Sequence, residues 1–110
     1  MVKRENIEFL KDILESIERI DSYVGNLRYE KFLKDLKTRD AVVRNLEIIG
    51  EAAKHIPANI RLRYKEIEWK KISGLRDKII HYYFGVNWEI VWDVIEDKLP
   101  KLKIQIEKIK

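Results

Sequence analysis

The chain has 110 residues, of which 45% are hydrophobic and 38% charged, and its formal net charge is +4. This length and composition predict one globular domain, residues 1–110, with a core of modest size. There is no cysteine, which excludes a disulfide framework, a thiolate nucleophile and a cysteine-based zinc site. Two histidines, His55 and His81, are too few for a His-rich metal cluster, so we expect no metal and no cofactor. No apolar run approaches the length of a membrane span and no signal-peptide core is present, so we expect a cytoplasmic protein without a membrane partner.

Positive charge is concentrated in residues 54–78. This segment has eight basic and three acidic residues, a net charge of +5, so the remainder of the chain sums to −1. The basic residues are Lys54, Arg61, Arg63, Lys65, Lys70, Lys71, Arg76 and Lys78. Such a block can attract phosphate groups, and the alternative interpretation is an ordinary solvated surface.

Apolar residues recur at steps of three and four from the start of the chain, which is the helical period. Residues 3–24 form two adjacent apolar stripes, so this helix has a wide apolar face that can contact a second surface as well as the core. Gly25 and Asn26 predict its end. Residues 29–36 are consistent with a short helix.

A second long helix is predicted to start after an N-cap at Thr38 or Asp40 and to end at Pro57. Its apolar residues lie within a narrow wedge of the helical wheel; they are Val42, Leu46, Ile49, Ala53 and Ile56. The opposite face carries Arg44, Glu47 and Glu51. We interpret the two glutamates of this polar face as solvated, and His55 as structural.

A third long helix is predicted over residues 68–84, with Ile72, Leu75, Ile79 and Tyr82 facing the core. Asn87 is the predicted cap of a last helix, in which Pro100 is expected to cause a kink or a short break. Four long helices with short connections predict an all-α, antiparallel bundle of four to five helices. Trp69, Trp88 and Trp92 are expected to be core or interface residues.

Reactive groups are concentrated in residues 74–83. This stretch contains Arg76, His81 and two tyrosines, which suit phosphodiester chemistry. A guanidinium grips phosphate oxygens, an imidazole can accept and donate protons near neutral pH, and RNA supplies its own 2′-hydroxyl nucleophile. Each residue also has a structural interpretation: the histidine as a surface residue, the arginine as an ion-pair partner, and the tyrosines as packing residues.

On a regular helix these groups do not all converge. Arg76 and His81 would lie about 140° apart, whereas Arg76 and Tyr83 would share one face and Asp77 and His81 another, close enough to hydrogen-bond. Either the helix changes course near His81, or a partner chain completes the site. A two-fold dimer would place two copies of the set near one axis.

The spacing from Arg76 through four residues to His81, and through one more to Tyr83, resembles the signature of HEPN domains in their HepT-like form. Asp77 fits the polar position that follows the arginine. Residues 44–53 resemble the family's second block. Residues 69–74, Trp92 and the pair Leu99-Pro100 extend the resemblance over nearly the whole chain.

This resemblance implies a HEPN-like bundle that dimerises, with its motif in a cleft at the dimer interface. It implies the toxin of a type VII-like toxin–antitoxin module, a metal-independent ribonuclease that acts on RNA. Arg76 would hold the scissile phosphate, His81 would act as acid or base, and Asp77 and Glu51 would orient them. The antitoxin would be a minimal nucleotidyltransferase that transfers AMP to Tyr83, where added charge would repel RNA.

Three functions therefore compete. The first is the ribonuclease toxin, and the second is a non-cleaving subunit that binds a nucleotide or polynucleotide for the nucleotidyltransferase. The third is a structural bundle without a site. RNA cleavage distinguishes the first from the second, and loss of any activity on substitution of Arg76 or His81 distinguishes both from the third.

Overall fold

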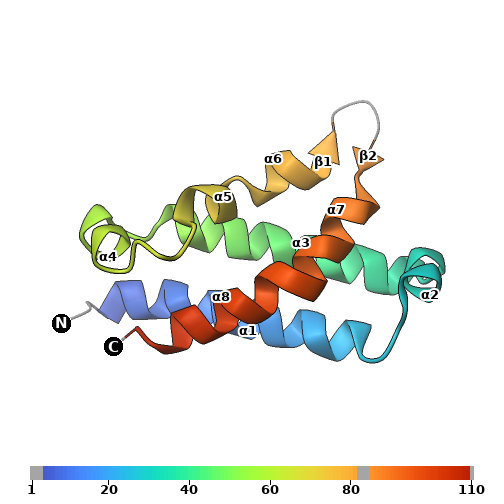
Figure 1. The fold of residues 1–110 in the computed structure, drawn as a ribbon, viewed down its shortest axis with the longest axis horizontal. Coiled ribbons are helices and arrows are strands. Elements are labelled where there is room, and N and C mark those ends of the chain that lie inside the picture. Colours follow the sequence, from blue (N-terminus) through green and yellow to red (C-terminus); the bar gives the residue numbers. More distant parts are fainter. Residues whose placement is uncertain (1–3, 82–84, 110) are drawn as a thin grey trace.

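The architecture is that of an all-α bundle, as predicted, to which the described residues add one antiparallel pair of two-residue strands (Figure 1). The computed structural model describes residues 4–81 and 85–109, and the side chains of all of these except Arg4, Glu5 and His81. Helices α1 (Arg4–Val24) and α3 (Leu36–Lys54) run antiparallel along the length of the molecule, and α8 (Leu99–Glu107) packs across α1. None of the helices among these residues is long and apolar enough to cross a membrane.

The pairing of α1 with α3 buries the centre of the core. Most of both apolar stripes of α1 packs within the chain, against α3 and α8, whereas Ile7 at the start of one stripe is 38% exposed. The buried residues of α1 are Leu10, Ile13, Ile17, Ile20 and Val24, and those of the predicted wedge are Val42, Leu46, Ile49, Ala53 and Ile56. Helix α1 ends where predicted, because Gly25 adopts a left-handed backbone with φ of 51°.

The start of α3 differs from the prediction. After the short helix α2 (Tyr29–Lys34), the N-cap of α3 is Asp35 and not Thr38 or Asp40. An Asp35 carboxylate oxygen accepts a hydrogen bond of 3.0 Å from the backbone N–H of Thr38. This bond lowers the pKa of Asp35 below its usual value, because it favours the charged carboxylate. The apolar pattern did not reveal this first turn because Leu36 is exposed.

The end of α3 is fixed by Arg61, from helix α4 (Ala58–Arg63). Its guanidinium donates hydrogen bonds to the carbonyl oxygens of Ile56 at 2.9 Å and Ala53 at 2.6 Å, and to the hydroxyl of Ser73 at 3.4 Å. The last carbonyls of a helix lack partners within it, so a cation there is favourable. Arg61 therefore links the end of α3 to helix α4 and to Ser73.

The prediction of one long helix over residues 68–84 is wrong for residues 68–81, and residues 82–84, including Tyr82, lie outside the described part of the chain. Helix α5 (Trp69–Ser73) ends at Gly74, and α6 (Leu75–Ile79) begins there. The chain then becomes extended as β1 (Ile80–His81), which pairs antiparallel with β2 (Gly85–Val86). Ile72, Leu75 and Ile79 are buried as predicted, so the apolar spacing survives the interruptions and concealed them.

The last helical segment is interrupted at Pro100, as predicted. The Asn87 side chain caps α7 (Trp88–Asp93) by accepting a 3.1 Å hydrogen bond from the N–H of Ile90. A π-helical turn, η1 (Val94–Lys98), then leads into α8, with Pro100 in its first turn. Proline lacks a backbone N–H, and the wider turn accommodates the missing bond without ending the helix.

The tryptophans pack as core residues, in agreement with the sequence interpretation. Trp69 is buried, and its indole N–H donates to the carbonyl of Tyr64 at 3.1 Å. Trp88 and Trp92 pack against Phe32, at ring-centroid distances of 5.8 and 5.1 Å. These contacts join α7 to α2 and leave the indoles little free surface.

At Gly50, the backbone of α3 comes close to the backbone at the end of α5. This contact sets the distance between α3 and the helices α5 and α6. A Cβ added to Gly50 would lie 3.3 Å from the carbonyl oxygen of Ile72, 3.6 Å from that of Ser73 and 3.9 Å from the Cβ of Leu75. The missing side chain thus lets the backbone between α5 and α6 rest on α3. This contact places α6 over the polar face of α3.

Replacing Arg61 by alanine should lower the free energy of unfolding by about 2 kcal/mol, because a hydrogen bond to a charged group contributes roughly 1.5–3 kcal/mol. Chemical denaturation measures this value. Arg63→Ala is the matched control: it removes an exposed arginine of the same helix and should cost less than about 1 kcal/mol. Equal costs for the two variants would contradict the role given to Arg61.

Gly50→Val should destabilise the fold by about 1–3 kcal/mol, because its branched side chain would collide with the backbone of Ile72 and Ser73. Asp40→Val controls for the lower helix propensity of valine, since Asp40 is exposed on the same helix. Thermal unfolding compares the two. If both variants melt together, the approach at Gly50 is not a tight constraint.

Candidate active site

A groove of about 490 Å³ is lined by residues of α1, α3, α5 and α6. Its apolar parts come from Phe9, Ile48 and Ala52, and Gly50 lies in its floor. The charged side chains that line it are Asp12, Arg44, Glu47, Glu51, Lys54 and Arg76. Two of the predicted site residues, Arg76 and Glu51, therefore share this groove although they are distant in sequence.

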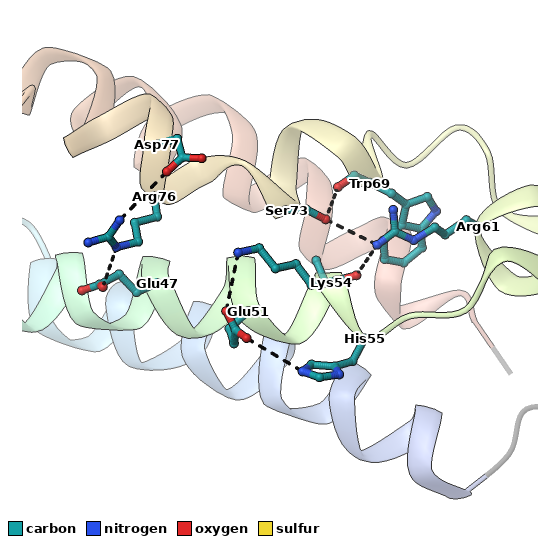
Figure 2. Close-up of polar contacts among 10 residues, drawn as sticks. Glu47, Glu51, Lys54, His55, Arg61, Trp69, Ser73, Arg76 and Asp77 are labelled. Carbon is teal, nitrogen blue, oxygen red and sulfur yellow. Dashed lines mark hydrogen bonds and ion pairs between the residues drawn. The ribbon is translucent and has the colours of Figure 1, made fainter. Parts of the chain in front are cut away.

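Arg76 lies in the first turn of α6 and is directed toward α3 (Figure 2). Its Nε lies 3.5 Å from Oε2 of Glu47, and its side chain remains 62% exposed. An exposed ion pair of this kind contributes about 1 kcal/mol or less to stability, so its main effect is to orient the guanidinium. The sequence pattern predicts a solvated Glu47 and does not reveal this contact, because Arg76 reaches it from another helix.

Asp77 lies at the edge of the site. Its carboxylate is 91% exposed and lies 4.0 Å from Nη1 of Arg76, the limit of an ion pair. The expected hydrogen bond from Asp77 to His81 assumed a helix running through both residues. That assumption is wrong, because α6 ends at Ile79.

Glu51 faces the groove one turn along α3 from Glu47. Its carboxylate lies 3.7 Å from Nζ of Lys54 and 3.9 Å from Nε2 of His55. These are its ion-pair partners within the described residues, and the contact of Arg76 goes to Glu47 instead. Figure 2 shows Glu47, Glu51 and His55 following one another along the same side of α3.

The structure describes the backbone of His81 but not its side chain, and Tyr83 lies outside the described residues. The backbone of His81 is in β1, two residues beyond the end of α6, and is paired with Gly85. Of the two alternatives drawn from the sequence, a change of course near His81 is what the backbone does, so the 140° separation on a straight helix does not apply.

His55, which we interpreted as structural, also lines the groove. It is the C-cap residue of α3, and its imidazole stacks on the ring of Phe9 with centroids 4.7 Å apart and an interplanar angle of 11°. Its side chain is 54% exposed. The spacing of four residues between Glu47, Glu51 and His55 was the sequence signal that could have grouped them.

The charges of the groove are balanced, with three basic and three acidic side chains. Of the basic segment predicted from the sequence, only Lys54 and Arg76 line this groove. Another pocket is lined by four further members, Arg61, Lys65, Lys70 and Lys71. Arg61 bonds to the end of α3, and Lys71 lies 2.6 Å from Glu68, whose pKa it lowers by stabilising the carboxylate. Among the residues whose positions are described, no group of three histidines and acids is placed to hold a metal ion.

This geometry suits the binding of an anion at Arg76. The guanidinium is oriented at one edge by Glu47, while its exposed edges can donate to phosphate oxygens in a bidentate manner. The motif histidine follows five residues later in the chain, on the extended segment after α6. An oriented arginine and a histidine are suitable groups for phosphodiester chemistry.

Comparison with known proteins identifies the family. The family model described as "Ribonuclease HepT-like" matches residues 13–109. The protein named "Putative RNase MJ0127" of Methanocaldococcus jannaschii is 44% identical over 99% of this chain and 90% of its own length. "Probable ribonuclease HepT" of Thermococcus cleftensis is 42% identical over 99% of both chains. No solved structure matches significantly. The chain belongs to the HepT-like ribonuclease family.

Proposed function

We propose that the protein is a metal-independent endoribonuclease that cuts RNA in the groove beside Arg76, and that it acts as a homodimeric toxin. The observation that carries the proposal is Arg76 itself. It is exposed in a groove, oriented by Glu47, and separated from His81 by the spacing that resembles the family signature. Membership in a ribonuclease family supports RNA as the substrate.

In this proposal Arg76 holds the scissile phosphate and stabilises the charge that accumulates on it. The 2′-hydroxyl oxygen attacks phosphorus and the bond to the 5′ oxygen breaks, leaving a 2′,3′-cyclic phosphate and a 5′-hydroxyl. His81 accepts the proton of the 2′-hydroxyl or donates one to the leaving oxygen. Asp77 and Glu51 support these groups through the local charge.

Dimerisation belongs to the same proposal. One chain presents a groove of balanced charge, and a two-fold partner would bring a second copy of Arg76 and His81 to a shared cleft. The resemblance to HepT-like proteins supports this arrangement. Light scattering at micromolar concentration tests it, and a monomer would contradict the shared cleft.

We expect purified protein to cleave total RNA in excess chelator. His81→Ala and Arg76→Ala should each slow cleavage by about 10²–10⁴-fold, because each removes one acid–base or charge-stabilising group. Arg63→Ala, which removes a distant exposed arginine, should cleave at the wild-type rate. The 2′,3′-cyclic ends can be identified on the products.

Two results would overturn the proposal. If all three variants cleave as the wild type does, the activity is a contaminant or lies elsewhere. If unmodified wild-type protein binds RNA or nucleotides without cutting, the chain is the non-cleaving subunit of a nucleotidyltransferase.

Neutralisation by AMP transfer to Tyr83 is the remaining part of the proposal. Co-expression with a minimal nucleotidyltransferase should add one or more AMP masses to the wild type and to Tyr82→Phe, but not to Tyr83→Phe. The added phosphate charge should abolish cleavage by repelling RNA. Intact-mass measurement decides this, and an adduct that persists in Tyr83→Phe would place the modification elsewhere.

A further inference from the structure

Two aromatic rings stack on the wall of the groove, away from Arg76. Phe9 of α1 is half-buried, and His55 at the end of α3 lies on it almost in parallel, with an angle of 11° between the rings. Phe9 covers one face of the imidazole. Since the His55 side chain is 54% exposed and lines the groove, its other face is available there.

The position of His55 is fixed by its neighbours. Phe9 supports the ring from below, and the Glu51 carboxylate lies 3.9 Å from Nε2. The backbone on either side is fastened by Arg61, which bonds to the carbonyls of Ala53 and Ile56. An aromatic ring held in one orientation loses little conformational entropy when a ligand stacks on it.

His55 lies on the same side of α3 as Glu47, the residue that orients Arg76 (Figure 2). Glu47, which orients Arg76, is followed by Glu51 and His55 at intervals of four residues, and Figure 2 shows all three along the same side of α3. Eight residues of helix span about 12 Å. This equals three or four stacked nucleotides at about 3.4 Å each, and fewer in a stretched strand.

We propose that the exposed face of His55 is a stacking platform for a nucleobase of single-stranded RNA whose scissile phosphate is held by Arg76. The proposal rests on the ribonuclease function and adds a base-binding subsite to it. Bases of unpaired RNA stack on aromatic side chains, histidine included, and this stacking tolerates all four bases. Duplex RNA keeps its bases in its own stack, so the subsite selects unpaired RNA.

Stacking and proton transfer by His55 make opposite predictions for one substitution. His55→Phe retains a flat ring but has no titratable nitrogen, whereas His55→Ala has neither. If the ring acts by stacking, the phenylalanine variant binds RNA as the wild type does and the alanine variant does not. If the imidazole transferred a proton, both variants would lose activity equally.

The probe is a set of short unpaired RNAs in which the fluorescent base 2-aminopurine occupies successive positions on both sides of the cleaved bond. Stacking on a ring quenches this base. We expect quenching in the wild type and in His55→Phe at a position two to four nucleotides from the cleaved bond, and its loss in His55→Ala. Affinity for the same RNA should fall about 5- to 100-fold in His55→Ala, the range found when a stacking residue is removed.

Lys54→Gln is the matched control. Lys54 precedes His55, contacts the same Glu51 and is similarly exposed, at 55%. Loss of its charge should weaken binding at low salt while leaving the quenching position unchanged. Thermal unfolding of each variant ensures that folded protein is compared.

The outcomes separate this inference from the proposed function. Wild-type cleavage with no quenched position, or with the same quenching in His55→Ala, overturns the platform and leaves the ribonuclease intact. Quenching that depends on His55, without cleavage by unmodified wild type, overturns the ribonuclease and retains the base-binding subsite. An equal loss in His55→Phe and His55→Ala overturns stacking.

Discussion

The close approach of two backbone segments at Gly50 is the constraint on which the site depends. The carbonyl oxygen of Ile72 lies only 3.3 Å from where a Cβ of Gly50 would be. With any larger residue, the junction of α5 and α6 would have to rise away from α3. Arg76 is the second residue of α6, directly after this junction, and its Nε lies 3.5 Å from Oε2 of Glu47 on α3. The missing side chain in the middle of a long helix therefore lets the start of α6 lie close to α3.

The fold also changes the meaning of the basic segment. As a sequence, residues 54–78 have a net charge of +5, which indicates an electropositive surface. In the folded chain Arg61 satisfies the end of α3, Lys71 pairs with Glu68, and Arg76 pairs with Glu47. The groove has as many acids as bases. The groove is therefore not a positively charged surface within one chain, although the segment that contributes Lys54 and Arg76 to it is basic.

The extended segment after α6 is the second feature that the helical pattern concealed. Ile72, Leu75 and Ile79 keep a helical spacing and are all buried, although the helix is broken at Gly74 and ends at Ile79. Burial in a bundle core needs apolar side chains at suitable positions, and two short helices supply them as well as one long helix. The angles expected between Arg76 and His81 on one straight helix therefore do not apply, because α6 ends at Ile79.

What the sequence determined by itself is local. The four-three spacing predicted the buried face of α3 but not its first and last residues, Gly25 ended α1, Asn87 capped α7, and Pro100 marked the π-helical turn. It also supplied Arg76 with its spacing to His81. These features depend on residues within a few turns of one another, where backbone geometry and side-chain reach fix the outcome.

Tertiary structure decided the pairings across distance. Glu47 orients Arg76 from another helix, and Phe9 of α1 stacks on His55 at the end of α3. Neither pairing has a local signal, because an exposed glutamate and a helix-terminal histidine have no preferred partner until the helices pack. The Gly50 contact and the pairing of α1 with α3 bring these elements together, and the groove exists only as their result.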